Sequence, residues 1–142
     1  MSNKDDFMIS ILGSHTTPGD EEESFELITE GSFSRTKERA EISYNDSEAT
    51  GFAGCRTKFI VEPQRITLTR DSWNGGDMVF DESEKQHFLY QTPFGSLAMG
   101  IDTEQVASTL DAKGGKLYIK YALDVDNVII SRNSFNISVK PA

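Results

Sequence analysis

The chain has 142 residues, of which 37% are hydrophobic and 26% charged, and its formal net charge is −9 at pH 7. This length fits one domain, so we expect a single domain spanning residues 1–142, with residues 1–6 as a flexible N-terminus. Because nucleic-acid binding needs Lys and Arg to neutralise phosphates, the acidic balance argues against a nucleic-acid partner and against an anionic membrane surface.

Hydrophobic and polar residues alternate with a period of two from the first apolar segment onward. Phe7, Ile9 and Ile11 share one face of a predicted strand, which we expect to end at Gly13. A polar, acidic loop follows over residues 14–23. The next strand runs through Phe33, and Gly31 interrupts its pattern, which predicts a bulge or a sharp bend there.

Shorter strands follow in close succession over residues 39–44, 55–62, 65–70 and 77–81. Asn74-Gly75-Gly76 lies between the last two of these strands and is a strong hairpin signal, because these residues tolerate positive φ angles. Two more strands are predicted at 86–92 and 95–103. Each segment has one apolar face, as expected when one side of a sheet faces a core and the other faces water.

The end of the chain contains one ambiguous segment. Residues 104–110 fit a helical turn about as well as a strand, so at most one short helix is expected here. The most regular strand follows at 116–125, and Asp126-Asn127 predicts a turn into a last strand over 128–140.

The sequence therefore predicts an all-β fold, a small closed antiparallel β-barrel of about 8–10 strands. We favour a barrel over a sandwich because closure removes sheet edges. The predicted core consists of the inward-facing residues of these strands: Phe59, Leu68, Phe88, Leu97, Met99, Leu117, Ile119, Tyr121, Phe135 and Ile137.

Cysteine usage and the start of the chain indicate a cytoplasmic protein. Cys55 is the single cysteine, so no intrachain disulfide can form. Residues 1–6 are net acidic and the apolar run after them is too short for a signal peptide. No stretch approaches the roughly 20 apolar residues of a membrane helix.

Familiar catalytic and metal-binding patterns are not found. His15 and His87 lie far apart in the sequence, and Asp124-x-Asp126 lacks the later ligands of a calcium loop. Lys113-Gly114-Gly115-Lys116 opens a strand, whereas a phosphate-binding loop opens a helix. We therefore predict no metal, no cofactor and no catalytic residue, and we interpret Cys55 as a small core residue.

Polar side chains on otherwise apolar faces form the one candidate site. Arg70 follows Ile66 and Leu68 in alternation, which directs its guanidinium inward, where a charge is costly unless it is paired or solvated. Either Arg70 lies at the barrel mouth or is satisfied by protein groups, or it binds an anion among tyrosines. The predicted ligand-binding residues are Arg70, Tyr90, Tyr121, Tyr44 and Asn133.

Several short motifs resemble one bacterial family in their order and spacing. They include Glu41-Ile42-Ser43-Tyr44, Ile66-Thr67-Leu68-Thr69-Arg70, Tyr90-Gln91-Thr92-Pro93-Phe94-Gly95, Tyr121-Ala122-Leu123 and Asn133-Ser134-Phe135. Together they resemble the DUF1934 family of YwiB-like proteins over nearly the whole chain. The resemblance implies a calycin-type, lipocalin-like barrel and supplies no activity. The loop around Trp73-Asn74-Gly75-Gly76 looks longer than the usual turn of the family.

Three classes of function remain open at this point. A barrel of about eight strands can hold a small molecule, which favours a binding module for an amphipathic or anionic ligand. The alternative is a non-catalytic interaction or structural protein that forms a homodimer through exposed strand faces or an uncovered edge. An enzyme that uses Arg70 and tyrosines is the weakest hypothesis. The chain is expected to be a monomer or a homodimer.

Overall fold

The computed structural model describes residues 7–47, 54–71 and 77–142. These residues form ten antiparallel strands and no helix. The strands are β1 (Phe7–Thr16), β2 (Glu23–Arg35), β3 (Ala40–Asn45), β4 (Arg56–Val61), β5 (Ile66–Arg70), β6 (Met78–Phe80), β7 (Gln86–Thr92), β8 (Gly95–Ser108), β9 (Gly115–Val125) and β10 (Val128–Pro141).

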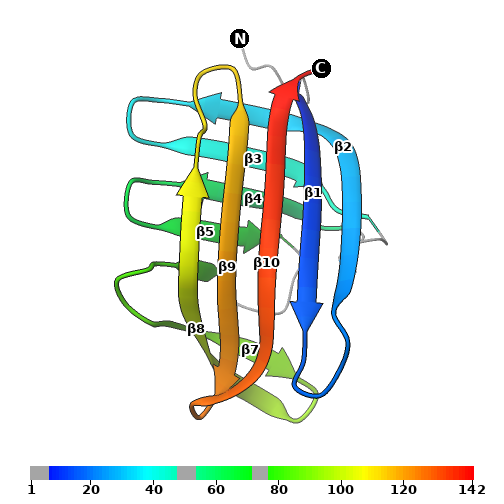
Figure 1. The fold of residues 1–142 in the computed structure, drawn as a ribbon, viewed down its shortest axis with the longest axis vertical. Helices are drawn as coiled ribbons and strands as arrows, with labels where there is room; N and C mark the ends of the chain where they lie inside the picture. Colours follow the sequence, from blue (N-terminus) through cyan, green and yellow to red (C-terminus); the bar gives the residue numbers. More distant parts are fainter. Residues whose placement is uncertain (1–6, 48–53, 72–76) are drawn as a thin grey trace.

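The ten strands form one sheet that curls into a nearly closed barrel (Figure 1). Their order is β6-β5-β4-β3-β2-β1-β10-β9-β8-β7, so nearly every strand pairs with its neighbours in the chain. Strands β3, β4 and β5 run across β1, β10 and β9, which lie in front of them in Figure 1. The two end strands, β6 and β7, follow each other in sequence. The all-β, antiparallel fold predicted from the alternation is confirmed.

Strand β2 bends at Gly31, where it leaves the group of strands that contains β1 and joins the group that contains β3. The β1–β2 ladder ends at the pair Phe7–Gly31, and the β2–β3 ladder begins at Gly31–Tyr44. A Cβ atom on Gly31 would lie 2.3 Å from Ile9 Cδ1 and 2.5 Å from the carbonyl oxygen of Ser43. Only glycine fits this close approach, and the bend predicted at this position is confirmed.

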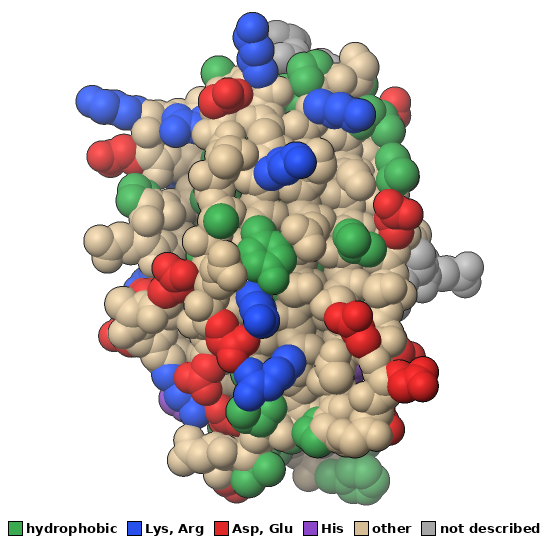
Figure 2. All heavy atoms as spheres, viewed as in Figure 1, with side chains coloured by type: hydrophobic (Ala, Val, Ile, Leu, Met, Phe, Trp, Pro, Cys, Tyr) green, Lys and Arg blue, Asp and Glu red, His purple; other side chains and the backbone are tan. Residues whose placement is uncertain are grey.

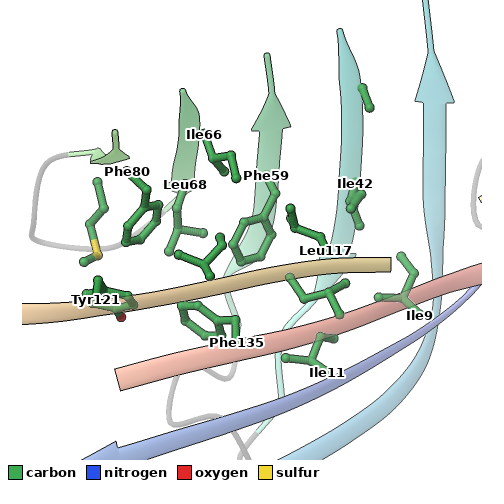
Figure 3. Close-up of a cluster of buried hydrophobic side chains, with 14 of the residues drawn as sticks. Ile9, Ile11, Ile42, Phe59, Ile66, Leu68, Phe80, Leu117, Tyr121 and Phe135 are labelled. Atoms are coloured by element: carbon green, nitrogen blue, oxygen red, sulfur yellow. The ribbon is translucent and has the colours of Figure 1, made fainter. Parts of the chain in front are cut away.

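The core lies between the two crossing groups of strands (Figure 3). Phe59 and Phe135 meet edge to face, with ring centroids 5.6 Å apart, and Tyr121 stacks on Phe135 at 6.0 Å. Aromatic pairs in these arrangements stabilise a core beyond their buried area. Nine of the ten predicted core residues are buried, and Cys55 is buried as predicted.

Leu97 is the exception, because its side chain is 38% exposed. It pairs with Tyr90 and shares a face with the buried Met99, so its direction follows the alternation. The β7–β8 hairpin, however, continues past the end of the core. Periodicity gives the face of a residue and does not show where along a strand the core ends.

Residues 104–110 form no helix, because β8 continues as a strand to Ser108 and pairs with β9. The register of this ladder shifts between Thr103 and Gln105. A β-bulge of this kind adds one residue to one strand and breaks the period of two. That extra residue explains why the sequence pattern resembled a helical turn. No helix among residues 7–47, 54–71 and 77–142 is long and apolar enough to cross a membrane.

Side chains close the barrel along the outer edge of β8. Glu82 accepts a hydrogen bond from the Val106 N–H at 2.9 Å, and Thr103 accepts one from the Asp81 N–H at 3.2 Å. Arg35 donates through Nε to the carbonyl oxygen of Leu110 at 3.2 Å. These bonds protect a strand edge that would otherwise be open to another chain.

A lysine connects three segments on the outside of the barrel. Lys85 Nζ lies 2.6 Å from Asp124 Oδ2 and 3.8 Å from Asp102 Oδ2, and it donates to Asn127 Oδ1 at 3.0 Å. Asp124 is buried beneath it. The hydrogen bond from Lys85 lowers the pKa of Asp124 below its ordinary value of 3.8.

Acid should therefore destabilise the fold through Asp124. A carboxylate whose pKa is lower in the folded than in the unfolded state adds stability at neutral pH, which is lost as the pH falls through the folded pKa. We expect Asp124→Asn to be less stable than the parent at pH 7, and to lose less stability between about pH 5 and pH 2. Urea unfolding at several pH values measures both effects. The exposed Glu26→Gln should show the parent's pH profile, and an equally steep profile for Asp124→Asn would contradict the assignment.

Candidate functional site

A cavity of about 260 Å³ opens at the end of the barrel where β1 and β9 end. Strands from both crossing groups contribute to its wall, which is mainly apolar. The apolar lining consists of Phe25, Met78, Phe88, Met99, Leu123 and Phe135, and the polar lining of Ser14, His15, Arg70, Tyr90, Tyr121, Asn133 and Ser134. An apolar cavity with a few polar groups is the usual form of a small-molecule site.

The polar groups on the β1–β10 side of the cavity are held by hydrogen bonds. His15 Nδ1 donates to Asn133 Oδ1 at 2.7 Å, and Asn133 Nδ2 donates to Ser131 Oγ at 3.0 Å. The hydroxyls of Ser14 and Ser134 are 2.7 Å apart. This side of the cavity therefore carries an ordered set of polar groups.

Arg70 reaches the cavity from the end of β5 and forms a buried ion pair. Its side chain is 6% exposed, and its Nε lies 3.7 Å from Oδ2 of Asp46, whose side chain is fully buried. Thr57 donates a hydrogen bond from its hydroxyl to the same carboxylate oxygen. Arg70 lines the cavity and Asp46 does not. The pair therefore presents its positive end to the cavity.

Two tyrosines flank this pair and remain protonated. Burial raises the pKa of Tyr44 well above its ordinary value, and the charge of Asp46 raises it further. Burial also raises the pKa of Tyr121, although the nearby Arg70 acts in the opposite direction. Both phenols are therefore neutral hydroxyls at physiological pH, and neither provides a base.

Of the five predicted ligand-binding residues, the structure brings four to this cavity. Arg70, Tyr90, Tyr121 and Asn133 all line it, although they come from four different strands. Tyr44 does not line it, because its side chain is 1% exposed and packed in the core. The alternation predicted that the Tyr44 side chain points into the barrel, but it could not show that the side chain lies in the core and away from the cavity.

Two residues with ionisable side chains at the site, Asp46 and His15, were not predicted from the sequence. Asp46 lies in a segment that reads as a turn, yet it continues the alternation of Ala40, Ile42 and Tyr44, and that signal identifies it as inward-facing. His15 was expected in a loop, but β1 extends to Thr16 and pairs His15 with Asn133 of β10. No local pattern shows that pairing, because it depends on the register of two distant strands.

A second, larger cavity of about 560 Å³ lies beside β8, along the line where side chains close the barrel. We call this line the seam and this cavity the seam cavity. Its charged residues include Arg35, Arg65, Asp81 and Glu82. Three of them form the hydrogen bonds that close the barrel. The side chains of Arg35 and Glu82 bond to backbone groups, and the backbone N–H of Asp81 bonds to the Thr103 hydroxyl. Arg65 lies 3.7 Å from Asp81. These charged residues of the larger cavity therefore have structural roles, and we take the smaller cavity as the candidate site.

Metal ligation has no visible basis in the part of the chain that the structure describes. Among those residues, no group of three or more His, Cys, Asp or Glu side chains is placed to hold an ion. The predicted absence of a metal stays a prediction.

Comparison with known proteins places this fold in a family. The model of the domain of unknown function DUF1934 matches residues 9–137. The chain belongs to the DUF1934 family. The fold is also similar to a solved structure: the crystal structure of the ywiB protein from Bacillus subtilis superposes with a TM-score of 0.78 at 18% identity, covering 96% of this chain and 91% of that one. No curated protein matches the chain.

Proposed function

We propose that this DUF1934 protein is a binding module that holds a small amphipathic molecule in the cavity at the end of its barrel. The observation that carries the proposal is the placement of Arg70, a side chain 6% exposed, in the wall of a mainly apolar cavity. A buried guanidinium is costly, and a protein that needed only packing there would do better with an apolar side chain.

The shape of the cavity supports a ligand with two chemically different ends. Its apolar body would lie against Phe88, Met99 and Tyr121, while its head would meet Arg70. Because Asp46 already balances the charge of Arg70, the head need not carry a full charge, but the positive end of the pair favours an anion or a strong hydrogen-bond acceptor. A volume of about 260 Å³ restricts the ligand to a small molecule.

Two further parts of the proposal concern the relationship of the fold and the location of the protein. A calycin-type relationship is supported by the antiparallel barrel with a cavity at its end, which is how that architecture holds ligands. A cytoplasmic location is supported by the single, buried cysteine. The proposal includes no enzymatic step, and the two tyrosines beside Arg70, which stay protonated, could not act as bases at neutral pH.

Two probes that differ only in the head group test the proposal. Octanoate and 1-octanol share the same chain, so we expect both to bind and octanoate to bind about tenfold more tightly, the value of one hydrogen bond to a charged group. Affinities should lie near millimolar for ligands of this size, which calorimetry or NMR titration can follow.

Paired variants separate this site from other apolar surfaces. In the variant Arg70→Leu/Asp46→Asn, which removes both charges together, the preference for octanoate should disappear while octanol still binds. Arg65→Leu removes a half-exposed arginine from the seam cavity and should leave both affinities unchanged. Equal binding of the two probes to the parent protein, or loss of the preference in Arg65→Leu, would contradict the proposed role of Arg70.

A further inference from the structure

The part of the β7–β8 hairpin nearest its turn carries no acidic residue, lysine or arginine. The stretch from Gln86 to Ile101 contains no Asp, Glu, Lys or Arg, although the chain has 14 Lys and Arg and 23 Asp and Glu. It is the longest such stretch in the sequence. Figure 2 shows that acidic and basic side chains are otherwise spread over the face in view.

Packing in the core accounts for the apolar side chains in only one half of this hairpin, the half farther from the turn. Phe88, Met99 and Ile101 are buried inside the barrel. Toward the turn, by contrast, four large apolar side chains are exposed: Phe94 by 98%, Leu89 by 54%, Tyr90 by 40% and Leu97 by 38%. We call these four residues the apolar tip. Hydrophobic side chains are also visible at the lower end of the face in Figure 2, the end at which Figure 1 shows both this hairpin and the β9–β10 turn.

Tyr90 and Leu97 pair on one face of the hairpin, Leu89 lies on the other face and Phe94 lies in the turn, so exposed apolar side chains surround the tip. Such a group of exposed apolar side chains indicates a surface that another molecule covers. Charge decides which molecule fits best. A basic partner would select one of the acidic surfaces and not an uncharged one. An anionic membrane would repel a chain with a net charge of −9.

A second copy of the chain fits the apolar tip without these conflicts. Two molecules of charge −9 repel each other, and over most of the surface they would bring like charges together. At the tip they meet without burying a charged group, so neither desolvation of ions nor close like-charge pairs opposes the contact. We propose that two copies associate through their apolar tips, in a two-fold arrangement that uses the same surface of each copy.

This inference is independent of the proposed ligand. Tyr90 belongs both to the tip and to the cavity wall, so the partner's hairpin would lie beside the cavity mouth. Arg70, however, lies inside the barrel and takes no part in the tip. The protein could therefore bind octanoate in the cavity without forming a dimer, or form a dimer without binding octanoate.

Sedimentation equilibrium of the whole chain tests the proposal. Because one hairpin per copy covers less than a standard interface, we expect a weak dimer, seen as a rise in average mass between about 10 and 500 µM. Added salt should strengthen the dimer, since it screens the repulsion between two acidic chains and there is no ion pair to weaken. Phe94→Asp should stay monomeric over the whole range.

The matched control is Ile28→Asp, which places the same charge on an exposed apolar residue of β2, 62% exposed and outside the tip. It should dimerise like the parent, and both variants should keep the parent's urea midpoint. A parent protein that is monomeric at 500 µM in about 0.5 M salt would overturn the proposal, as would an intact Phe94→Asp dimer. Binding of a monomeric parent to neutral phosphatidylcholine vesicles would overturn it in favour of a lipid surface.

Discussion

Replacing Arg70 by leucine should lower the free energy of unfolding by about 3–5 kcal/mol, because it leaves the carboxylate of Asp46 buried without the cation that now balances it. The side chain of Asp46 is fully buried, so water cannot take the place of the guanidinium. Urea unfolding followed by fluorescence measures the change as a shift of the midpoint.

The double variant Arg70→Leu/Asp46→Asn is the control for this prediction. It removes both charges, and the asparagine amide oxygen can still accept the hydrogen bond from Thr57. We expect it to recover most of the stability lost in Arg70→Leu. Replacing a buried ion pair by two uncharged side chains changes the free energy of unfolding much less than removing only one of the two charges. Equal losses in the single and double variants would show that the two residues are not coupled.

Truncation of Ile119 to alanine should cost about 2–5 kcal/mol, since its side chain is fully enclosed and its removal leaves an empty space. Phe88→Ala removes a larger side chain, for which about 3–5 kcal/mol is typical. Phe88 lines the open cavity, however, so its removal enlarges a space that solvent can enter. We therefore expect Phe88→Ala to cost no more than Ile119→Ala.

Urea midpoints of the two variants decide the comparison, with Ile28→Ala as an exposed control that should stay within about 0.5 kcal/mol of the parent. A much larger loss for Phe88→Ala than for Ile119→Ala would mean that the cavity is closed and dry. That result would also remove the entry path that the proposed ligand needs.

Most of the fold could be predicted because the strands alternate regularly and connect through short turns. The alternation directed Arg70, Tyr90 and Tyr121 inward, and barrel closure then brought them to one cavity. The bend at Gly31 was also readable, since a glycine inside a strand pattern marks a close approach. These features are local, and local patterns are what a sequence expresses directly.

The remaining features depend on distant parts of the chain. The ion pair between Arg70 and Asp46 joins β5 to the segment after β3, and the contact of His15 with Asn133 depends on the β1–β10 register. The bulge after Thr103 concealed a strand. The depth of Tyr44 and the exposure of Leu97 depend on where the barrel ends. None of these follows from the period of a single strand.

The claim that the cavity beside Arg70 holds an amphipathic ligand can be tested by an NMR titration of the ¹⁵N-labelled protein with octanoate. We expect saturable shifts that are largest for the backbone amides of Phe88, Met99, Tyr121 and Asn133, with little change in the seam residues Arg35 and Glu82. Shifts that are spread evenly over the surface, that centre on the seam, or that fail to saturate would contradict the claim.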